Sequence, residues 1–197
     1  MVLVIDTSSA RSALALIEEG RPAAEDVVEA GREHDLRRRV AALAEPARLS
    51  GVAVSLGPGS FTGLRAGVSF GVGLALGLQV PLWGLDPLRL QAARASQPTT
   101  ALVEAGRGRI FWLEPGAADL RHGEPGELPG QFPAVGWLRP ATAEMVSGAG
   151  VRLLAEGELK SFAEAAASQL EGAPQLGYGT VSLRYMESIV PLRGQSW

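Results

Sequence analysis

The sequence predicts an α/β fold divided into two lobes. The N-terminal residues contain apolar, strand-like segments that follow one another with only short turns between them, which is typical of an antiparallel meander. Helical spacing and further strands follow, up to a polar break at residues 96–98. After this break the chain again opens with strand, turn and strand. We therefore expect a first lobe at residues 1–95 and a second, smaller lobe at residues 96–197.

The individual elements follow from apolar spacing and from helix caps. Leu36, Val40 and Leu43 have the spacing of a helical face, and Asp86 stands where a helix cap is expected. The expected strands are residues 2–5, 12–17, 23–30, 51–56, 80–83, 100–104 and 109–113. The expected helices are residues 33–43, 62–78, 87–95 and 160–170. Residues 114–150 are rich in proline and glycine and predict only short strand-like pieces.

The composition excludes several kinds of function. The chain has 197 residues, a formal net charge of −3 and no cysteine, so disulfides, thiolate metal sites and a cysteine nucleophile are excluded. Its single lysine, Lys160, lacks the glycine spacing of a Walker phosphate loop. The two histidines, His34 and His122, are too far apart in sequence for a paired-histidine zinc site on one helix. No general excess of basic residues predicts a nucleic-acid surface.

The apolar segments predict neither a leader nor a membrane span. Residues 2–5 run directly into Asp6 with no basic region before them, which favours a first strand over a signal peptide. After Arg65 the uncharged part of residues 62–78 is about a dozen residues long, below the roughly 18 that span a bilayer. We expect a buried helix there. Absence of cysteine fits a reducing compartment, and we expect a cytoplasmic protein without membrane contact.

The loop at residues 57–63 is the most informative motif. The strand expected at residues 51–56 is followed by Gly57 and Gly59 and then by a helix. The backbone N–H groups of this loop and the helix dipole could hold an anion. The alternative is that Ser60 or Thr62 simply caps the helix.

The helix after this loop carries regularly spaced glycines. Gly63, Gly67, Gly71 and Ala75 recur every four residues, and we name this row the small-residue ridge. Each interior glycine costs a helix about 1 kcal/mol relative to alanine, which indicates a compensating close contact. The contact is either with the protein's own sheet or with another subunit.

Two polar segments have competing interpretations. Asp6, Thr7 and Ser8 at the first turn could hold Mg²⁺ and phosphate oxygens, or form an Asx-turn. The basic run at residues 37–39 is more typical of a solvated face than of an RNA site, and His34 more typical of a surface or interface residue than of a base. The sequence pairs no general base with a nucleophile.

The nonamer Gly-Pro-Gly-Ser-Phe-Thr-Gly-Leu-Arg at residues 57–65, preceded by Ile5-Asp6-Thr7-Ser8 and Arg32-Glu33-His34, resembles the TsaB (YeaZ) family. This family supplies subunits of the bacterial machinery that makes threonylcarbamoyladenosine in tRNA. The resemblance is close over residues 1–95 and loose afterwards. It implies the actin/Hsp70/sugar-kinase-like (ASKHA) fold, with two lobes whose mixed sheets are flanked by helices.

The resemblance also implies a non-catalytic paralogue of the catalytic TsaD subunit. The family pairs with TsaD through helices that match residues 33–43 and 62–78 here, which makes a helix-on-helix contact the favoured interpretation of the small-residue ridge. The implied partner interface comprises His34, Arg38, Gly63, Arg65, Gly67, Phe70, Gly71, Leu74 and Ala75. Asp6, Thr7 and Ser8 would be a vestigial phosphate loop, with the helix N-terminal loop formed by Gly57, Gly59, Ser60 and Thr62.

Further expectations concern cofactors and partners. No cofactor or metal is expected on this chain, because ATP and metal belong to the partner subunits of the family. The partners implied are a TsaD-like catalytic subunit, a TsaE-like ATPase, tRNA reached through the complex, and a second copy of the chain in isolation. The family's usual Asp-Ala-Arg in the second-lobe turn is Glu104-Ala105-Gly106 here, so a nucleotide role for that turn is not expected. The competing hypothesis is an independent ATPase of the same fold or a peptidase-like enzyme.

Overall fold

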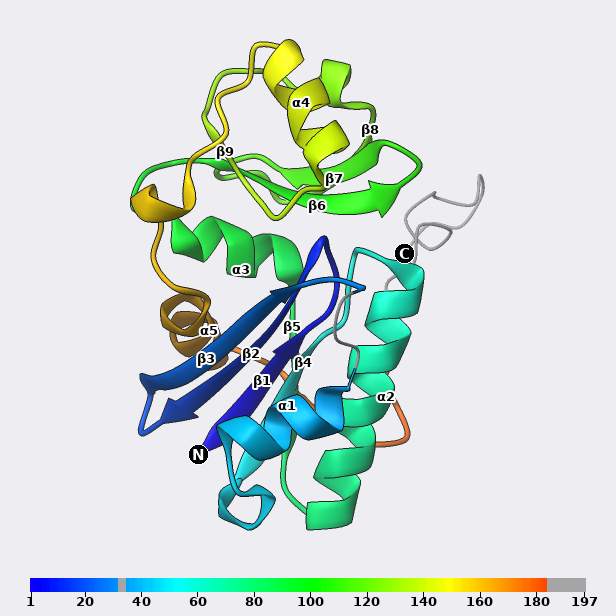
Figure 1. Ribbon diagram of the computed structural model, residues 1–197, viewed down its shortest axis with the longest axis vertical. Helices are drawn as coiled ribbons and strands as arrows, with labels where there is room; N and C mark the ends of the chain where they lie inside the picture. The colour runs from blue at the N-terminus through cyan, green and yellow to red at the C-terminus, as the bar shows by residue number, and fades with distance from the viewer. Residues whose placement is uncertain (32–34, 184–197) are drawn as a thin grey trace.

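Two β-sheets, one in each lobe, lie one above the other along the long axis of the molecule (Figure 1). The computed structural model describes residues 1–31 and 35–183. The first sheet has six strands in the order β10-β5-β4-β1-β2-β3. Its strands are β1 (Val2–Asp6), β2 (Arg11–Glu18), β3 (Arg21–Glu29), β4 (Gly51–Ser55), β5 (Leu82–Leu85) and β10 (Gln175–Leu176). β1 pairs antiparallel with β2 and parallel with β4, and β4 pairs parallel with β5, so the sheet is mixed as expected.

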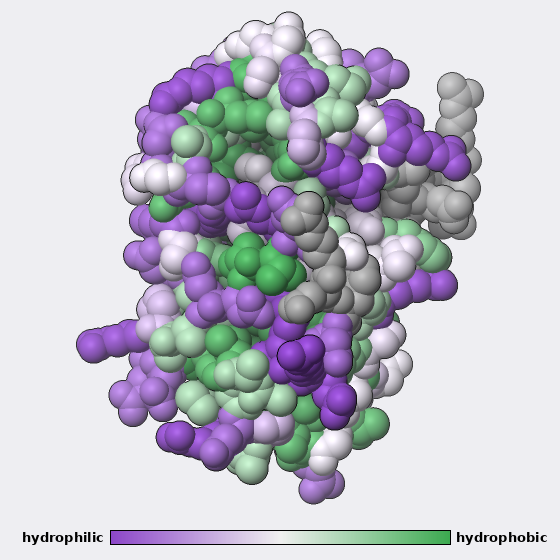
Figure 2. Space-filling view, in the orientation of Figure 1, coloured by the Kyte–Doolittle hydropathy of each residue, from purple (hydrophilic) through white to green (hydrophobic). Residues whose placement is uncertain are grey.

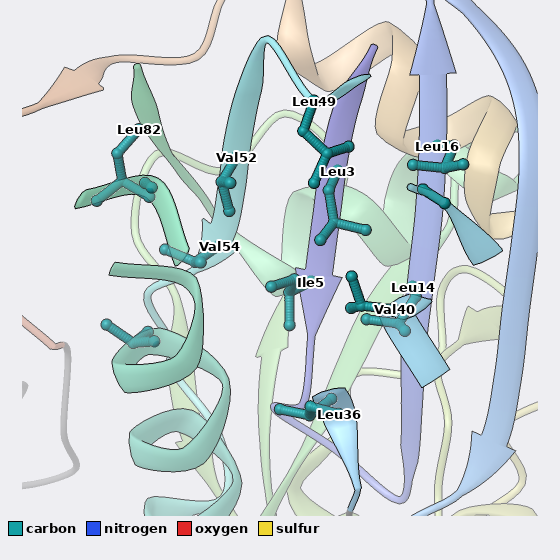
Figure 3. Packing of buried hydrophobic residues seen from close by; sticks show 13 residues of the cluster. Leu3, Ile5, Leu14, Leu16, Leu36, Val40, Leu49, Val52, Val54 and Leu82 are labelled. Carbon is teal, nitrogen blue, oxygen red and sulfur yellow. The ribbon is translucent and has the colours of Figure 1, made fainter. Parts of the chain in front are cut away.

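The central strands are apolar on both faces because helices cover both sides of the sheet. On one side lie α1 (Leu36–Leu43) and α2 (Phe61–Leu78), whose inward residues join Leu3, Ile5 and Val54 in one core cluster (Figure 3). On the other side lie α3 (Pro87–Arg94) and α5 (Phe162–Leu170). This double cover explains why residues 2–5 read as a continuous apolar run rather than an alternating one.

The second sheet is smaller, with the order β8-β7-β6-β9. Its strands are β6 (Thr100–Gly106), β7 (Arg109–Leu113), β8 (Arg121–Gly123) and β9 (Ala134–Val135). One face packs on α4 (Pro140–Gly148) and the other on α3, which therefore lies between the two sheets. Short 3₁₀ turns at Pro46–Arg48, Pro125–Glu127 and Glu156–Glu158 complete the described chain.

The structure differs from the sequence expectation at several places. Helix α4 lies within residues 114–150, where only short strand-like pieces were expected. The chain also returns to the first lobe after residue 160, because α5 packs on β2 and β3 while β10 adds an edge strand to β5. The expected second lobe at residues 96–197 is therefore too long by these two elements. β5 begins two residues later than expected, after the helix cap of α2 at Gln79.

Candidate functional site

The small-residue ridge of α2 faces the protein's own first lobe. A Cβ added to Gly67 would lie 2.2 Å from Thr7 Oγ1, and one added to Gly71 would lie 2.3 Å from Val54 Cγ1. At Gly63 the Cβ would lie 1.9 Å from the carbonyl oxygen of Thr7. Ala75, the last member of the ridge, is fully buried. The expectation that the ridge meets a partner helix is therefore wrong: the glycines let α2 approach the sheet and the first turn.

The side of α2 that points away from the sheet is exposed and carries apolar residues together with the polar Thr62, Arg65 and Ser69. Phe61 and Leu76 are 53% and 56% exposed, and the Arg65 guanidinium lies 4.1 Å from the centre of the Phe61 ring. A Cβ added to Gly73 or Gly77 would meet nothing within 4 Å. We call these five residues the outward face of α2; Phe70 and Leu74 are half-buried at its border and pack against the core cluster. Figure 2 views the molecule from the side that carries α1 and α2, where apolar residues stand among hydrophilic ones.

Helix α2 is less buried than expected. Its 18 residues have a mean hydropathy of 1.4, and by length and composition alone it could cross a membrane. Only 28% of this stretch is buried, although the expectation was a buried helix. The buried residues all belong to the side that packs on the sheet, namely Leu64, Gly67, Val68, Gly71 and Ala75. A helix this apolar with one open side leaves apolar surface available for a contact.

Helix α1 covers the same face of the first sheet as α2 and is anchored by one buried arginine. Arg39 is 6% exposed, and its Nε donates to Asp26 Oδ2 at 2.7 Å while its Nη1 donates to Ser12 Oγ at 2.7 Å. The expectation of a solvated basic run is therefore wrong for Arg39. Arg38 is exposed, with its backbone N–H donating to the cap residue Asp35. His34 lies outside the described residues.

The loop before α2 is a helix cap closed over the first turn. Ser60 accepts a hydrogen bond from the N–H of Gly63, which confirms the capping interpretation, and Thr62 is exposed on the first turn of the helix. The N–H of Ser60 donates to the carbonyl of Ser8 at 2.7 Å. Gly59 has a φ of +156°, and a Cβ there would lie 2.3 Å from that same carbonyl. The loop and the first turn therefore bond to each other.

The first turn uses its own polar groups internally. The N–H of Ser8 donates to Asp6 Oδ1 at 2.9 Å, which is the Asx-turn interpretation. The Thr7 hydroxyl donates to the carbonyl of Gly63 at 2.7 Å. Asp6 is 1% exposed, and burial is the main reason that its pKa is raised above the ordinary value; the hydrogen bonds from Ser8 act in the opposite direction. Asp6 Oδ2 accepts no hydrogen bond from the described residues.

The turn also connects the lobes. The Ser9 hydroxyl donates to the carbonyl of Trp137 at 2.6 Å and accepts from the N–H of Glu104 at 3.3 Å. The N–H of Ala10 donates to the same Trp137 carbonyl. Asp6 Oδ1 and the hydroxyls of Thr7 and Ser9 are thus engaged within the chain, whereas Asp6 Oδ2 and the Ser8 hydroxyl have no hydrogen-bond partner among the described residues. Within residues 1–31 and 35–183, no cluster of three metal-ligating side chains occurs.

Glu104, the acid at the second-lobe turn, caps helix α4. Glu104 is 5% exposed, and its Oε1 accepts a hydrogen bond at 2.8 Å from the N–H of Arg139, the residue that precedes α4. Arg139 offers no side-chain cap of its own, so the carboxylate of a neighbouring strand takes that role. The sequence contains no sign of this contact, since α4 itself was not expected.

A buried arginine forms a second junction between the lobes. Arg94 in α3 is 3% exposed and forms an ion pair with Glu156, while its guanidinium carbon lies 4.7 Å from the centre of the Trp137 ring. The same carboxylate accepts a hydrogen bond from the indole N–H of Trp137 at 3.0 Å and pairs with Arg11 at 3.1 Å. These residues lie too far apart in sequence for spacing to indicate them.

Known proteins resemble this chain in sequence and in fold. A family model described as "TsaD: tRNA N6-adenosine threonylcarbamoyltransferase" matches residues 40–123. The tRNA threonylcarbamoyladenosine biosynthesis protein TsaB of Escherichia coli strain K12 is 35% identical over 71 residues, which are 34% of this chain and 31% of that protein. The protein of the same name from Bacillus subtilis strain 168 is 30% identical over 120 residues, 56% of this chain and 52% of that protein. The matched stretches thus span from about a third to about half of these relatives' lengths.

The solved structure described as "YeaZ from Pseudomonas aeruginosa" shares the fold. It superposes with a TM-score of 0.69 at 20% identity and covers 94% of this chain and 99% of that one. Two lobes with mixed sheets flanked by helices, joined through a first turn at the end of β1, define a protein of the ASKHA fold class. In sequence and in fold, the chain is thus similar to proteins of the TsaB (YeaZ) family.

Proposed function

We propose that this chain is a non-catalytic subunit of the complex that transfers threonylcarbamoyl from its adenylate to N6 of adenosine 37 in tRNA. It would act as a scaffold that dimerises with a TsaD-like catalytic subunit and helps form the docking surface for a TsaE-like ATPase. Contact with tRNA would be indirect, through the complex, and the protein would be cytoplasmic. The names of the relatives support a role in tRNA threonylcarbamoyladenosine biosynthesis, and the exposed side of α2 supports a role in binding a partner.

The outward face of α2 is the observation that carries this proposal. An 18-residue apolar helix buries one side on its own sheet and leaves Phe61 and Leu76 more than half exposed. Gly73 and Gly77 on that side leave room for a second helix to approach closely. The proposed interface therefore keeps Arg38, Arg65, Phe70 and Leu74, adds Phe61, Gly73, Leu76 and Gly77, and no longer includes the small-residue ridge.

The rival function, an independent ATPase or peptidase-like enzyme, has less support. Asp6 Oδ1, the hydroxyls of Thr7 and Ser9, and the second-lobe acid Glu104 are engaged in hydrogen bonds within the chain. A scaffold needs no such groups, because it raises activity only by favouring the competent state of its partner. We therefore expect ATP and metal to be held by the partner subunits.

The interface is tested by adding bulk to the open side of α2. Gly73→Leu should leave the fold intact, since nothing lies within 4 Å of its Cβ position, and should weaken binding to the TsaD-like subunit by roughly 5- to 150-fold, as expected of about 1–3 kcal/mol of overpacking. Gly148→Leu, at the end of α4 and equally open, is the matched control and should bind normally. Calorimetry of the purified pair measures both. Unchanged affinity for a folded Gly73→Leu protein would refute the interface.

The scaffold role is tested in the reconstituted modification reaction. With every subunit saturating, a weakened interface is rescued by mass action, whereas a lost catalytic group is not. Gly73→Leu should therefore recover activity as its concentration rises, and Asp6→Asn should remain active throughout. If Asp6→Asn abolished tRNA modification or ATP turnover at saturation while still binding its partner, the chain would be supplying chemistry. Light scattering of the isolated chain at increasing concentration tests whether the same face also forms a homodimer, which Gly73→Leu should then dissociate.

A further inference from the structure

A cavity of about 480 Å³ lies between the lobes and is lined by none of the residues of the outward face of α2. From the first lobe its walls come from the end of β4, the end of β5 and the start of α3, including Leu56, Asp86 and Arg89. The end of α5 at Gln169 also belongs to the first lobe, and the second lobe contributes the end of β7 at Leu113 and the following chain as far as Leu120. The carboxyl ends of parallel strands are where open α/β sheets commonly bind ligands.

The walls combine apolar surface with one cation. Leu56, Leu113 and Leu120 are half-buried, so they present apolar surface that is packed on one side and open on the other. Arg89 is exposed at the rim and forms no ion pair within residues 1–31 and 35–183. The volume lies in the range of small-molecule sites, and the walls present leucine side chains together with polar groups, among them Ser168 and Gln169.

Asp86 also lines the cavity, but its negative charge is partly compensated and therefore repels a bound anion less than a free carboxylate would. Asp86 Oδ1 accepts hydrogen bonds from the backbone N–H groups of Leu88 at 2.8 Å and of Arg89 at 3.3 Å. This carboxylate therefore faces the positive end of the α3 dipole, which compensates part of its charge. The guanidinium of Arg89 remains the group that can pair with a ligand.

A neighbouring cavity of about 460 Å³ shares Arg89, Leu113 and Gln169 with the first. The two spaces therefore meet at the arginine, with apolar surface extending to either side. We propose that this interlobe cavity binds a small organic anion whose apolar body packs on the leucines and whose carboxylate or phosphate group pairs with Arg89. The site is independent of the interface in the proposed function. Since both lobes contribute walls, the ligand would also hold the two lobes together.

Titration calorimetry of the full chain with three six-carbon probes tests the proposal. Hexanoate and hexyl phosphate carry the anion, and hexanamide is the neutral control; comparing the first two distinguishes a carboxylate site from a phosphate site. We expect at least one anion to bind about tenfold more tightly than hexanamide, because an Arg–anion pair is a charge-assisted hydrogen bond. Arg89→Gln should remove that difference. Arg48→Gln, an exposed arginine outside the cavity, should leave it unchanged.

A second variant tests the place of binding. Ala118 is exposed and lines the same cavity, so Ala118→Trp should fill the space without disturbing the core and should abolish binding of all three probes. Circular dichroism confirms that each variant is folded. Equal affinity of an anion for the native chain and for Arg89→Gln would overturn the proposal, as would binding that survives Ala118→Trp. Failure of both anions to bind at millimolar concentration would also overturn it.

Discussion

The hydroxyl of Thr7 occupies the space that a side chain on Gly67 would need. Thr7 Oγ1 lies 2.2 Å from the position of a Gly67 Cβ and donates to the carbonyl of Gly63, four residues earlier in the helix, at 2.7 Å. The first turn and α2 are therefore joined through a polar contact that only glycine allows. This contact distinguishes Gly67 and the rest of the small-residue ridge, which pack on the first lobe, from Gly73 and Gly77, whose Cβ positions meet nothing within 4 Å.

Alanine substitution on the two sides of α2 should have opposite effects on stability. Gly67→Ala forces Thr7 or the helix to move and should lower the free energy of unfolding by about 1–3 kcal/mol. Gly73→Ala, on the open side, should raise it by up to about 1 kcal/mol, because alanine is the better helix former and meets nothing within 4 Å. Urea denaturation measures both. Similar effects of the two substitutions would contradict this assignment of the faces.

We expect the buried carboxylate of Asp6 to lower the free energy of unfolding at neutral pH. Burial raises its pKa in the folded protein above the ordinary value of 3.8, and the nearby negative charge of Asp86 adds to this shift. Below 3.8 both states are protonated and the cost is absent; as the pH rises from there through the raised pKa of the fold, stability is lost. Asp6→Asn, which keeps the acceptor for the Ser8 N–H, should therefore gain stability over the native chain as the pH is raised from 4 to 7.

Glu158, an exposed acid whose pKa is shifted in the opposite direction from that of Asp6, provides the control. Hydrogen bonding from the N–H of Ala155 and the charge of Arg152 lower the pKa of Glu158 below its ordinary value of 4.5. Its contribution is present above 4.5 and is lost as the pH falls through the lowered pKa. Glu158→Gln should thus lose stability relative to the native chain as the pH rises from the lowered pKa to about 4.5, and the difference should stay constant above that. Denaturation curves of both variants at several pH values compare the slopes, and slopes of the same sign would count against the burial effect at Asp6.

Glu104 should matter as a hydrogen-bond acceptor rather than as a charge. Glu104→Gln retains an oxygen for the N–H of Arg139 and should remain as stable as the native chain and fully active in tRNA modification. Glu104→Ala leaves that N–H without an acceptor and should lower the free energy of unfolding by about 1–3 kcal/mol. Thermal denaturation distinguishes them. A Glu104→Gln protein that folds normally but is inactive would assign the carboxylate a chemical role.

Glu156 should hold the lobes in their relative orientation. Glu156→Gln removes the negative charge that faces the buried Arg94, and because Glu156 itself is half exposed we expect a loss of about 2 kcal/mol, below that of a fully buried pair. Arg152→Gln, which breaks an exposed pair, is the control and should change little. Hydrogen exchange should show faster opening of α3 in Glu156→Gln alone. Equal protection of α3 in both variants would mean that the charge does not fix the junction.

The first lobe was predictable because its signals are local. Val2–Asp6 is an apolar run because helices cover both faces of the sheet, and Ser60 and Asp86 are residues whose side chains cap helices. Helix α4 was missed because its cap comes from Glu104 on a distant strand and its sequence follows a proline- and glycine-rich stretch. The return of β10 to the first sheet was equally hidden, since a two-residue strand has no periodicity to detect.

The sequence alone determined the fold class, the family resemblance and the presence of close contacts along α2. It could not determine which contacts these were, because Gly63, Gly67 and Gly71 have the same four-residue spacing as Gly73 and Gly77. Only the tertiary structure placed Thr7 and Val54 against the first row and left the second row open. It likewise decided that Arg39 and Arg94 are buried anchors and not solvated charges. A helical repeat shows that small residues share a face, but the element packed against that face comes from elsewhere in the chain.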